Sequence, residues 1–417
     1  MSDRDERIVV VGAGECGARA ALTLRSEGWL GHISLIGDEG FYPYERPPLS
    51  KAAWSDLSGD GPPPAVDAET FEASGIDFLA DSAATTVHLD ARIVEVASGI
   101  SLGYDRLILA TGARARLLDV PGGSHACVLR TWNDLLRLRP LLVANQRVGV
   151  IGAGFIGMEL ASVAAELGCH VTIIEVAPRV LARAVPAAIA AKVADRHLTA
   201  GVDLRLERAV VRIDSLALGL SIALDDGSSV ACDVVVAGIG SIPNVELAQR
   251  AGLQVDNGIK VDAHLRTSNE FVLAAGDCCS FLHPLFGGRR LRLESWRSAL
   301  EQGGLAARNA LGANEALSAV PWFWSDQFDL GLQIAGLPDE AVSNVNRNRP
   351  DGGLVEFGLD VEGRLVSASS IGSGTQTAKD VRIAEMLIAR RAHPDPTHLG
   401  DPNANLKPLL ISKEPQH

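Results

Sequence analysis

The stretch that decides the fold is RIVVVGAGECGARAALTLRSEGWLGHISLIGD, residues 7–38. Its apolar run over 8–11 predicts a buried strand that leads into a glycine-rich turn. The residues after the turn predict a helix over 18–27 and a second strand over 33–36. Strand, turn, helix and strand in this order are typical of a Rossmann-like α/β unit, which binds a dinucleotide at its turn.

The glycine spacing gives each residue of the turn a physical role. Gly12 permits the tight bend, Gly14 lets the backbone approach a pyrophosphate, and Gly17 lets helix and strand pack closely. Asp38, 21 residues after Gly17, can accept hydrogen bonds from ribose hydroxyls. A lone glycine pattern is weak, but here the strand, the helix and the acid accompany it.

A second copy of the unit occupies residues 147–175, RVGVIGAGFIGMELASVAAELGCHVTIIE. It starts its turn 140 residues after the first copy and ends on an acid, Glu175, 18 residues after its third glycine. Its glycines are Gly152, Gly154 and Gly157. Two complete units in one chain imply two dinucleotides, and flavin with nicotinamide is the natural pair.

Glu175 bears on the choice of nicotinamide. Its carboxylate can bond both ribose hydroxyls and would repel a 2′-phosphate, which favours NADH. Arg179 and Arg183 follow closely, so some use of NADPH stays open.

Composition limits the remaining possibilities. The 417 residues are 47% apolar, enough for two or three domains, and no apolar run approaches the length of a membrane span. The net charge of −13 disfavours nucleic acid as a partner. Without a signal-peptide pattern at the start, we expect a cytoplasmic protein with no membrane partner. The six cysteines lack metal-ligand spacing, which favours small buried residues and no metal.

Two further segments carry a resemblance to a known family. PYERPPLSK at 43–51 and PWFWSDQ at 321–327 resemble the FAD-dependent NAD(P)H:ferredoxin reductases of the oxygenase-coupled type, which are related to rubredoxin reductases and apoptosis-inducing-factor-type flavoproteins. The resemblance covers the whole chain. It implies an α/β fold with two Rossmann-like dinucleotide-binding domains, as in glutathione reductase, and a C-terminal α+β domain. The implied boundaries are 1–115 and 246–319 for the FAD-binding domain, 116–245 for the NAD-binding domain, and 320–417 for the last domain.

The resemblance also implies a set of site residues. The set for FAD is Gly12, Gly14, Gly17, Asp38, Arg46, Lys51, Thr111, Gly112, Asp277 and Trp296. The set for NAD is Gly152, Gly154, Gly157, Glu159, Glu175 and Gly240. From the residues alone, Asp277 could cap the following segment, Trp296 could be a core residue, and Arg46 could be a solvated loop charge.

The expected catalytic pair is Lys51 and Glu159. In the family the lysine lies near the reactive edge of the flavin, and the acid approaches the nicotinamide and pairs with that lysine. From the sequence alone, Glu159 on the first turn of its helix could simply complement the helix dipole.

The expected activity follows from the cofactors and from a missing residue type. Residues 41–51 contain no cysteine, which argues against disulfide-reductase chemistry. We therefore expect hydride to pass from NADH to FAD and single electrons to pass on to a small iron–sulfur ferredoxin that serves a Rieske-type or cytochrome P450 oxygenase. Rubredoxin reductase is one alternative, and an NADH-sensing flavoprotein that acts through protein binding is another.

A small acidic ferredoxin would need a basic docking surface on this acidic protein. The candidate patch is Arg289, Arg290, Arg292 and Arg297, with Glu294 as the only carboxylate among them. The alternative is that these arginines are solvated or paired within the protein.

Overall fold

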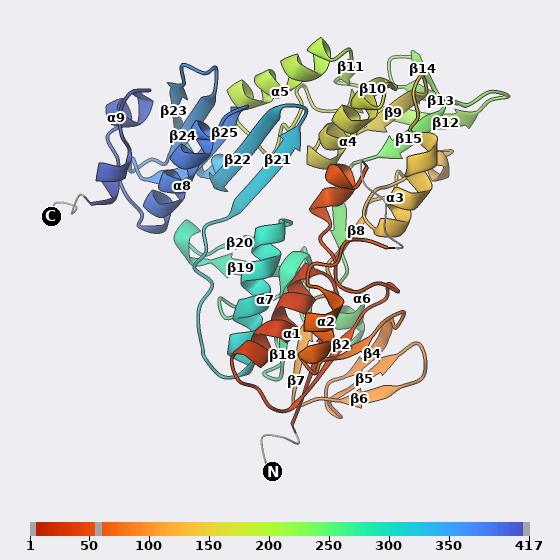
Figure 1. The fold of residues 1–417 in the computed structure, drawn as a ribbon, viewed down its shortest axis with the longest axis vertical. Helices are drawn as coiled ribbons and strands as arrows, with labels where there is room; N and C mark the ends of the chain where they lie inside the picture. The colour runs from red at the N-terminus through yellow and green to blue at the C-terminus, as the bar shows by residue number, and fades with distance from the viewer. Residues whose placement is uncertain (1–5, 55–60, 412–417) are drawn as a thin grey trace. The chain divides into compact units, whose positions relative to one another are not determined.

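The structure is a computed structural model that describes residues 6–54 and 61–411. Residues 1–5, the start of the segment considered for a signal peptide, lie outside the described part. The chain divides into two compact units, and it passes between them several times (Figure 1). The first unit comprises 1–46, 57–114 and 242–319, and the second comprises 47–56, 115–241 and 320–417.

A five-stranded parallel sheet with the order β18-β7-β1-β2-β3 forms the core of the first unit. Its strands are β1 (Arg7–Val11), β2 (His32–Ile36), β3 (Asp77–Leu79), β7 (Arg106–Leu109) and β18 (Val272–Ala274). The inner strands are almost fully apolar and buried, as expected for parallel strands covered on both faces. Helix α1 (Glu15–Ser26) follows β1 and packs beside α7 (Trp296–Ala310) (Figure 1).

Smaller elements complete the first unit. A small antiparallel sheet comprises β4 (Ala84–His88), β5 (Ile93–Val96) and β6 (Ser101–Gly103). A second small sheet joins β17 (Ile259–Lys260), β19 (Cys279–His283) and β20 (Arg289–Leu291). Short helices of this unit include α2 (Ala68–Ala73), α6 (Glu246–Arg250) and the 3-10 turn η5 (Gly276–Cys278). Strands β8 (Ala113–Ala115) and β16 (Ser241–Pro243) pair where the chain leaves and re-enters this unit.

The second unit contains the duplicated nucleotide fold. Its parallel sheet has the order β11-β10-β9-β15. These strands are β9 (Arg147–Ile151), β10 (His170–Glu175), β11 (Asp203–Leu206) and β15 (Val234–Ala237), and the helices are α3 (Trp132–Leu138), α4 (Phe155–Glu166) and α5 (Ala187–Thr199). The segment before Lys51 forms a short 3-10 turn, η1 (Pro47–Ser50), followed by η2 (Ala52–Trp54).

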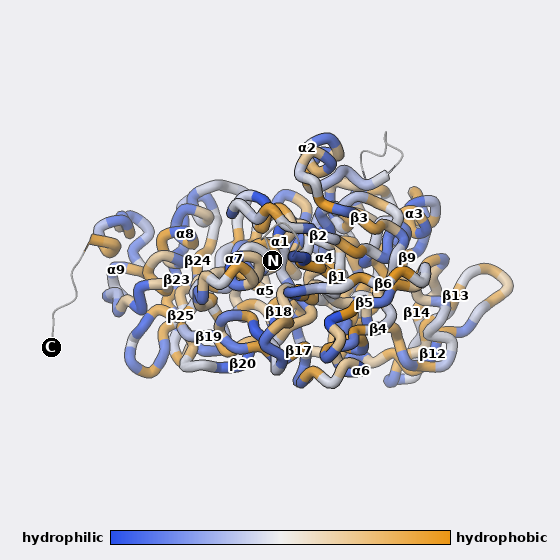
Figure 2. The backbone as a smooth tube through the Cα atoms, turned by 90° about the horizontal axis from the view of Figure 1, so that it is seen from below, coloured by the Kyte–Doolittle hydropathy of each residue, from blue (hydrophilic) through white to orange (hydrophobic). Residues whose placement is uncertain are grey.

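An antiparallel sheet that the sequence did not predict packs against this parallel sheet. It consists of β12 (Val210–Ser215), β13 (Leu220–Leu224) and β14 (Ser229–Cys232). Ile213, Ile222 and Leu224 from these strands share one hydrophobic cluster with Ile151 and Ile174. The turn after β12 carries the exposed Leu216 and Leu218, and Figure 2 shows this loop in the hydrophobic colour.

Residues 322–372 form an antiparallel sheet with the order β21-β22-β25-β24-β23. The strands are β21 (Trp322–Gln327), β22 (Leu330–Gly336), β23 (Ser343–Asn348), β24 (Leu354–Leu359) and β25 (Leu365–Gly372), with α8 (Gln376–Ala389) against the sheet and α9 (Pro396–Gly400) near its edge. Arg347 of β23 is fully buried and lies 3.3 Å from Asp380 of α8. The same carboxylate pairs with Arg349, 2.5 Å away.

Candidate active site

The predicted flavin residues of the first unit gather at one edge of its sheet. Four of its segments follow the carboxyl ends of the adjacent parallel strands β18, β7, β1 and β2. In that strand order, the segments are Asp277, Thr111–Gly112, Gly12–Gly17 and Asp38. Parallel strands end at the same edge, so the sheet brings together residues that lie far apart in the sequence.

The first glycine turn has the geometry that a pyrophosphate requires. Gly12 has φ +107°, and a Cβ there would lie 2.1 Å from the Ala110 carbonyl oxygen. A Cβ on Gly17 would lie 1.8 Å from the Gly12 carbonyl oxygen, so helix and turn are in close contact. A Cβ on Gly14, in contrast, would meet no described atom within 4 Å. The turn therefore leaves open space beside the start of α1, where backbone N–H groups favour phosphate.

Two sets of hydrogen-bonded contacts support this edge of the sheet. The Gly276 amide donates to Gln302 Oε1 of α7 across 2.8 Å, and a Cβ on Gly276 would lie 3.1 Å from Cys16 Sγ. This contact places the neighbouring Asp277 beside the first glycine turn. Thr111 Oγ1 donates to the Asn244 carbonyl across 2.6 Å, and the Asn244 amide group returns a bond to the Thr111 carbonyl.

The acid after β2 does not occupy the same position as the acid of the second copy. Ile36 pairs with Val11 as Ile174 pairs with Ile151, so Gly37 of the first copy corresponds to Glu175 of the second. Asp38 lies one residue further on and is exposed.

Arg46 has a partner that the sequence did not reveal. Its guanidinium lies 2.8 Å from Glu39 Oε1, and the Tyr44 hydroxyl donates to the other oxygen of the same carboxylate. The sequence shows two adjacent acids, Asp38 and Glu39, either of which could have paired with Arg46. Their positions in the sequence did not indicate which of the two faces the loop that carries Arg46.

Trp296 is the first residue of α7 and lies within reach of Glu15, the first residue of α1. Burial raises the pKa of Glu15 to about 6, and the negative charge of Glu45 acts in the same direction. An aromatic ring and a carboxyl group that titrates near neutral pH therefore flank the start of α1.

The second glycine turn repeats the first. Gly152 has φ +99°, and a Cβ there would lie 2.6 Å from the Gly238 carbonyl oxygen. A Cβ on Gly157 would lie 2.1 Å from the Gly152 carbonyl oxygen, whereas the nearest described atom to a Cβ on Gly154 is 3.9 Å away. Gly240, after β15, also opens onto space that is empty of described atoms within 4 Å.

Glu175 is fixed at the end of β10. Its Oε2 accepts from the Ala153 amide at 2.6 Å, and its Oε1 accepts from the Ala177 amide at 2.8 Å. Arg179 donates to two backbone carbonyls of its own loop, those of Ala182 and Val185. Its guanidinium is thereby directed to the backbone, while Arg183 is exposed.

The structure brings Lys51 and Glu159 together. Lys51 Nζ lies 3.3 Å from Glu159 Oε1, and both side chains are largely buried. Helix α4 begins at Phe155, so the prediction that Glu159 lies on the first turn was wrong: it lies on the second. The influence of the helix dipole falls off within the first turn, which weakens the simpler interpretation of this acid.

Sequence reasoning missed three residues around this pair. The Ser50 hydroxyl donates to Glu159 Oε2 at 2.5 Å, and the Ser325 hydroxyl donates to Oε1 at 2.6 Å. Asp326 Oδ2 lies 3.2 Å from Lys51 Nζ. Burial raises the pKa of Glu159, while Lys51 and the two hydroxyls lower it.

Arginines of the candidate docking patch have partners within the protein. Arg290 donates to the Ser280 carbonyl at 2.6 Å, Arg292 pairs with Glu294, and Arg297 lies 3.0 Å from Glu301. Arg289 is exposed. The alternative interpretation of paired arginines thus holds for Arg290, Arg292 and Arg297.

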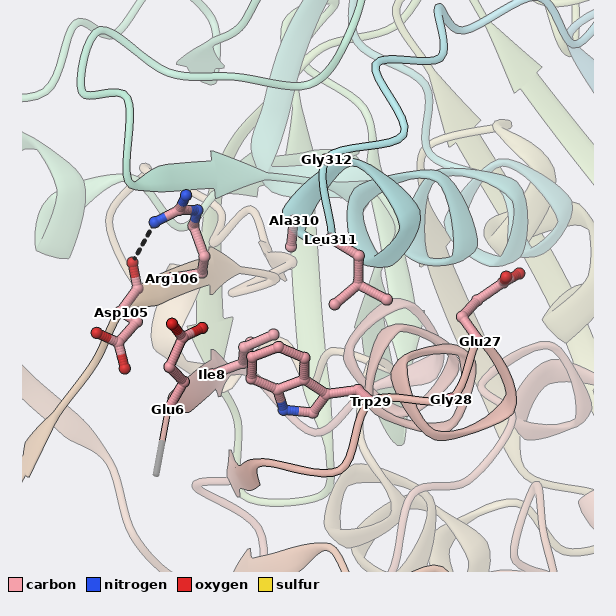
Figure 3. A pocket seen from close by; sticks show the side chains of 10 residues that line it. All are labelled: Glu6, Ile8, Glu27, Gly28, Trp29, Asp105, Arg106, Ala310, Leu311 and Gly312. Atoms are coloured by element: carbon pink, nitrogen blue, oxygen red, sulfur yellow. Dashed lines mark hydrogen bonds between the residues drawn. The ribbon is translucent and has the colours of Figure 1, made fainter. Parts of the chain in front are cut away.

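A cavity of about 370 Å³ lies at the opposite edge of the first sheet (Figure 3). It is lined by Glu6, Trp29, Asp105, Arg106 and residues at the end of α7, with the Glu6 carboxylate facing the Trp29 ring. Strands β1 and β7 begin here, whereas the glycine turn and Thr111 follow their carboxyl ends. This cavity is therefore separate from the nucleotide edge.

Two family models match the chain. Residues 6–303 match the model described as pyridine nucleotide-disulphide oxidoreductase, and residues 322–410 match the one described as reductase C-terminal. The chain belongs to the pyridine nucleotide-disulphide oxidoreductase family. This confirms the oxidoreductase class and the expected cofactors, FAD and NADH.

Relatives match over nearly the full length. The chain is 41% identical to the anthranilate 1,2-dioxygenase system ferredoxin–NAD(+) reductase component of Burkholderia cepacia, over 96% of this chain and 98% of that protein. It is 35% identical to putidaredoxin reductase of Pseudomonas putida, over 98% and 97% of the two chains.

A solved structure confirms the predicted α/β fold with its C-terminal domain. The ferredoxin reductase for the CYP199A2 system from Rhodopseudomonas palustris superposes with a TM-score of 0.92 at 34% identity, covering 97% of this chain and 99% of that one. In the described ranges, no helix is long and apolar enough to cross a membrane. All six cysteines are free thiols, and five of them are buried.

Proposed function

We propose that this protein passes electrons from NADH through FAD to a small iron–sulfur ferredoxin that serves a Rieske-type or cytochrome P450 oxygenase. The observation that carries the proposal is the pair of glycine turns, each open at its middle glycine, in a chain with no cysteine in residues 41–51. Without such a thiol, electrons leave for an external acceptor. The names of the relatives, ferredoxin–NAD(+) reductase component and putidaredoxin reductase, support a ferredoxin in that role.

The proposed cofactor residues are those expected from the sequence. For FAD they are Gly12, Gly14, Gly17, Asp38, Arg46, Lys51, Thr111, Gly112, Asp277 and Trp296; for NADH they are Gly152, Gly154, Gly157, Glu159, Glu175 and Gly240. When bound, FAD would supply the chemistry that links two-electron hydride transfer to single-electron transfer. The open turns at Gly14 and Gly154 would present backbone N–H groups to the phosphates.

Glu175 would accept from the ribose hydroxyls of NADH. Its backbone partners leave its position fixed, and a carboxylate oxygen can accept more than one hydrogen bond. The same charge would repel a 2′-phosphate.

Lys51 and Glu159 are the proposed catalytic residues. The ammonium of Lys51 and the carboxylate of Glu159 would stabilise the charge that develops where the hydride is transferred, and each would orient the other. Their burial excludes water, which strengthens the interaction between them.

The domain boundaries proposed are 1–115 with 246–319 for FAD, 116–245 for NADH, and 320–417 for the C-terminal domain. The breaks between the compact units near 114, 241 and 319 support them. We also propose a cytoplasmic location, where NADH and reduced ferredoxin partners occur.

The proposed docking patch for an acidic ferredoxin is Arg289, Arg290, Arg292 and Arg297. Arg289 is exposed whereas the other three are only partly exposed, so Arg289 would contribute most to steering the partner.

One experiment tests the acceptor. The purified protein is reduced anaerobically with NADH and then mixed rapidly with candidate ferredoxins and rubredoxins, while the flavin and iron–sulfur absorbances are followed. Fast reduction of a ferredoxin supports the proposal. Fast reduction of rubredoxin alone would favour the second candidate, for which a rubredoxin-NAD(+) reductase of Pseudomonas putida at 37% identity is the supporting relative. Slow reduction of every carrier would contradict both.

A further inference from the structure

Two hydroxyls surround the buried carboxylate of Glu159, one on each oxygen. Ser50, the last residue of η1, donates to Oε2, and Ser325 of β21 donates to Oε1. The Gln327 amide group donates to Ser325 Oγ across 3.1 Å, so the hydroxyl proton of that serine is left for Glu159. Hydrogen bonds donated to a carboxylate favour its ionised form.

The ammonium of Lys51 lies between two carboxylates of different exposure. It is 3.3 Å from the buried Glu159 and 3.2 Å from Asp326, whose side chain is 58% exposed. The ring of Trp324 lies 4.9 Å from the same nitrogen. Asp326 therefore takes a share of the interaction that Glu159 would otherwise have with Lys51.

Strand β21 and helix α4 are held together independently of these polar contacts. The rings of Phe155 on α4 and Phe323 on β21 lie 4.1 Å apart, centre to centre. Removing one hydroxyl of the polar group should therefore leave β21 packed on α4.

We infer that Ser50, Ser325 and Asp326 are positioning residues that set the charge of the Lys51–Glu159 pair: the hydroxyls hold Glu159 ionised, and Asp326 opposes this by sharing the ammonium. The C-terminal domain, which supplies β21, thereby controls an acid on the helix of the nicotinamide fingerprint. The importance of this control for catalysis rests on the proposed function, but the charge itself is a property of the protein.

Other charged groups near Glu159 act less directly. His197 of α5 faces the Met158 carbonyl across 3.1 Å, and burial lowers its pKa, so it is uncharged at neutral pH. Arg196 and Asp329 form an ion pair at the turn after β21. Lys51 and Asp326 are thus the charges that compete at the carboxylate.

The test is the titration of Glu159 in the FAD-bound protein, followed by infrared absorption of its protonated carboxyl group and assigned by difference from Glu159→Gln. Ser325→Ala and Ser50→Ala should each raise the midpoint by about one pH unit, because an ionised carboxylate loses a donor. Asp326→Asn should lower it, because Lys51 then interacts with Glu159 alone. Asp329→Asn, three residues along the chain, is the matched control and should leave it unchanged.

Opposite shifts for Ser325→Ala and Asp326→Asn support the inference, and Ser325→Thr, which keeps the hydroxyl, should restore the original midpoint. Unchanged midpoints, or shifts of the same sign in both variants, would overturn it. The measurement uses no electron acceptor, so failure of ferredoxin reduction would count against the proposed function and leave this result intact.

Discussion

The carboxylate of Glu175 accepts a hydrogen bond from the backbone amide of Ala153 across 2.6 Å. The acid at the end of β10 is thus tied to the glycine turn at the end of β9, its neighbour in the sheet. A second bond, from Ala177, fixes the other oxygen. The residue proposed to read the ribose is therefore held in place by the fold itself.

Replacing Glu175 with Arg should shift the coenzyme preference from NADH towards NADPH. The change removes the ribose acceptor and adds a donor for a 2′-phosphate, so the ratio of the two kcat/KM values should move by about tenfold to a hundredfold. Steady-state kinetics with ferricyanide as the acceptor measures the ratio. Asp203→Arg, an equal charge change at an exposed position on β11, is the control and should leave the ratio unaltered.

Gly14→Val and Gly154→Val should separate the two nucleotide sites. The fold leaves room for a side chain at each position, so both variants should fold, but a valine would occupy the space proposed for a phosphate. Gly14→Val should purify without FAD, while Gly154→Val should stay yellow, release its non-covalent FAD on denaturation and bind NADH weakly. A Gly14→Val protein that retains FAD would contradict the assignment of the first turn.

Arg289→Glu should slow ferredoxin reduction and flatten its dependence on salt, mainly by lowering the encounter rate. Ferricyanide reduction by NADH should hardly change, because a small acceptor needs no extended surface. We choose Arg289 because Arg290 bonds the backbone of β19, and its replacement would disturb the sheet. Equal loss with both acceptors would indicate damage to the flavin site, and no loss would place docking elsewhere. Arg205→Glu on β11 serves as the charge control.

Asp380→Ala should strongly destabilise the protein. It leaves the guanidinium of Arg347, with a side chain 1% exposed, without its carboxylate, and breaking a buried pair in this way costs about 3–5 kcal/mol. Urea unfolding followed by circular dichroism would measure the loss. Asp214→Ala removes the partner of Arg212 on the surface of β12 and should cost less than about 1 kcal/mol. Similar costs for both variants would refute the structural role of the buried pair.

Glu15 should make stability depend on pH. Its pKa in the folded protein, about 6, is above the ordinary value of 4.5, so the folded state binds this proton more tightly than the unfolded chain does. The contribution of Glu15 to the free energy of unfolding is complete below its ordinary pKa of 4.5. This contribution is lost as the pH rises through the folded-state pKa of about 6. Glu15→Gln should therefore raise the Tm near neutral pH and leave it unchanged in acid. A Tm difference that does not vary with pH would refute this linkage.

The local parts of the fold could be predicted from the sequence because their signals are local. The glycine spacings fix β1-α1-β2 and β9-α4-β10, since each turn, strand and helix lies within about thirty consecutive residues. The fold class was confirmed, whereas the domain boundaries and the roles of the site residues stay predictions.

The polar surroundings of Glu159 could not be predicted in this way. Ser325 is separated from it by 166 residues, and nothing in the sequence near either residue signals the contact. The internal partners of the docking-patch arginines could not be predicted for a related reason. The sequence shows that each arginine carries a positive charge but not what it contacts. Arg290 donates to a backbone carbonyl of β19, and the pairing of β19 with β20 brings the two close together.

The strand order of the first unit has a consequence for how the protein is made. Strand β18 pairs with β7, although the chain leaves this unit after residue 114 and returns at 242. While the ribosome makes the intervening segment, β7 remains an unpaired sheet edge, and such edges recruit other chains. The segment with the second glycine turn is continuous and can fold during synthesis, but the parallel sheet of the first unit has to wait for residues 272–274. We therefore expect a fragment whose translation stops short of them to be prone to aggregation.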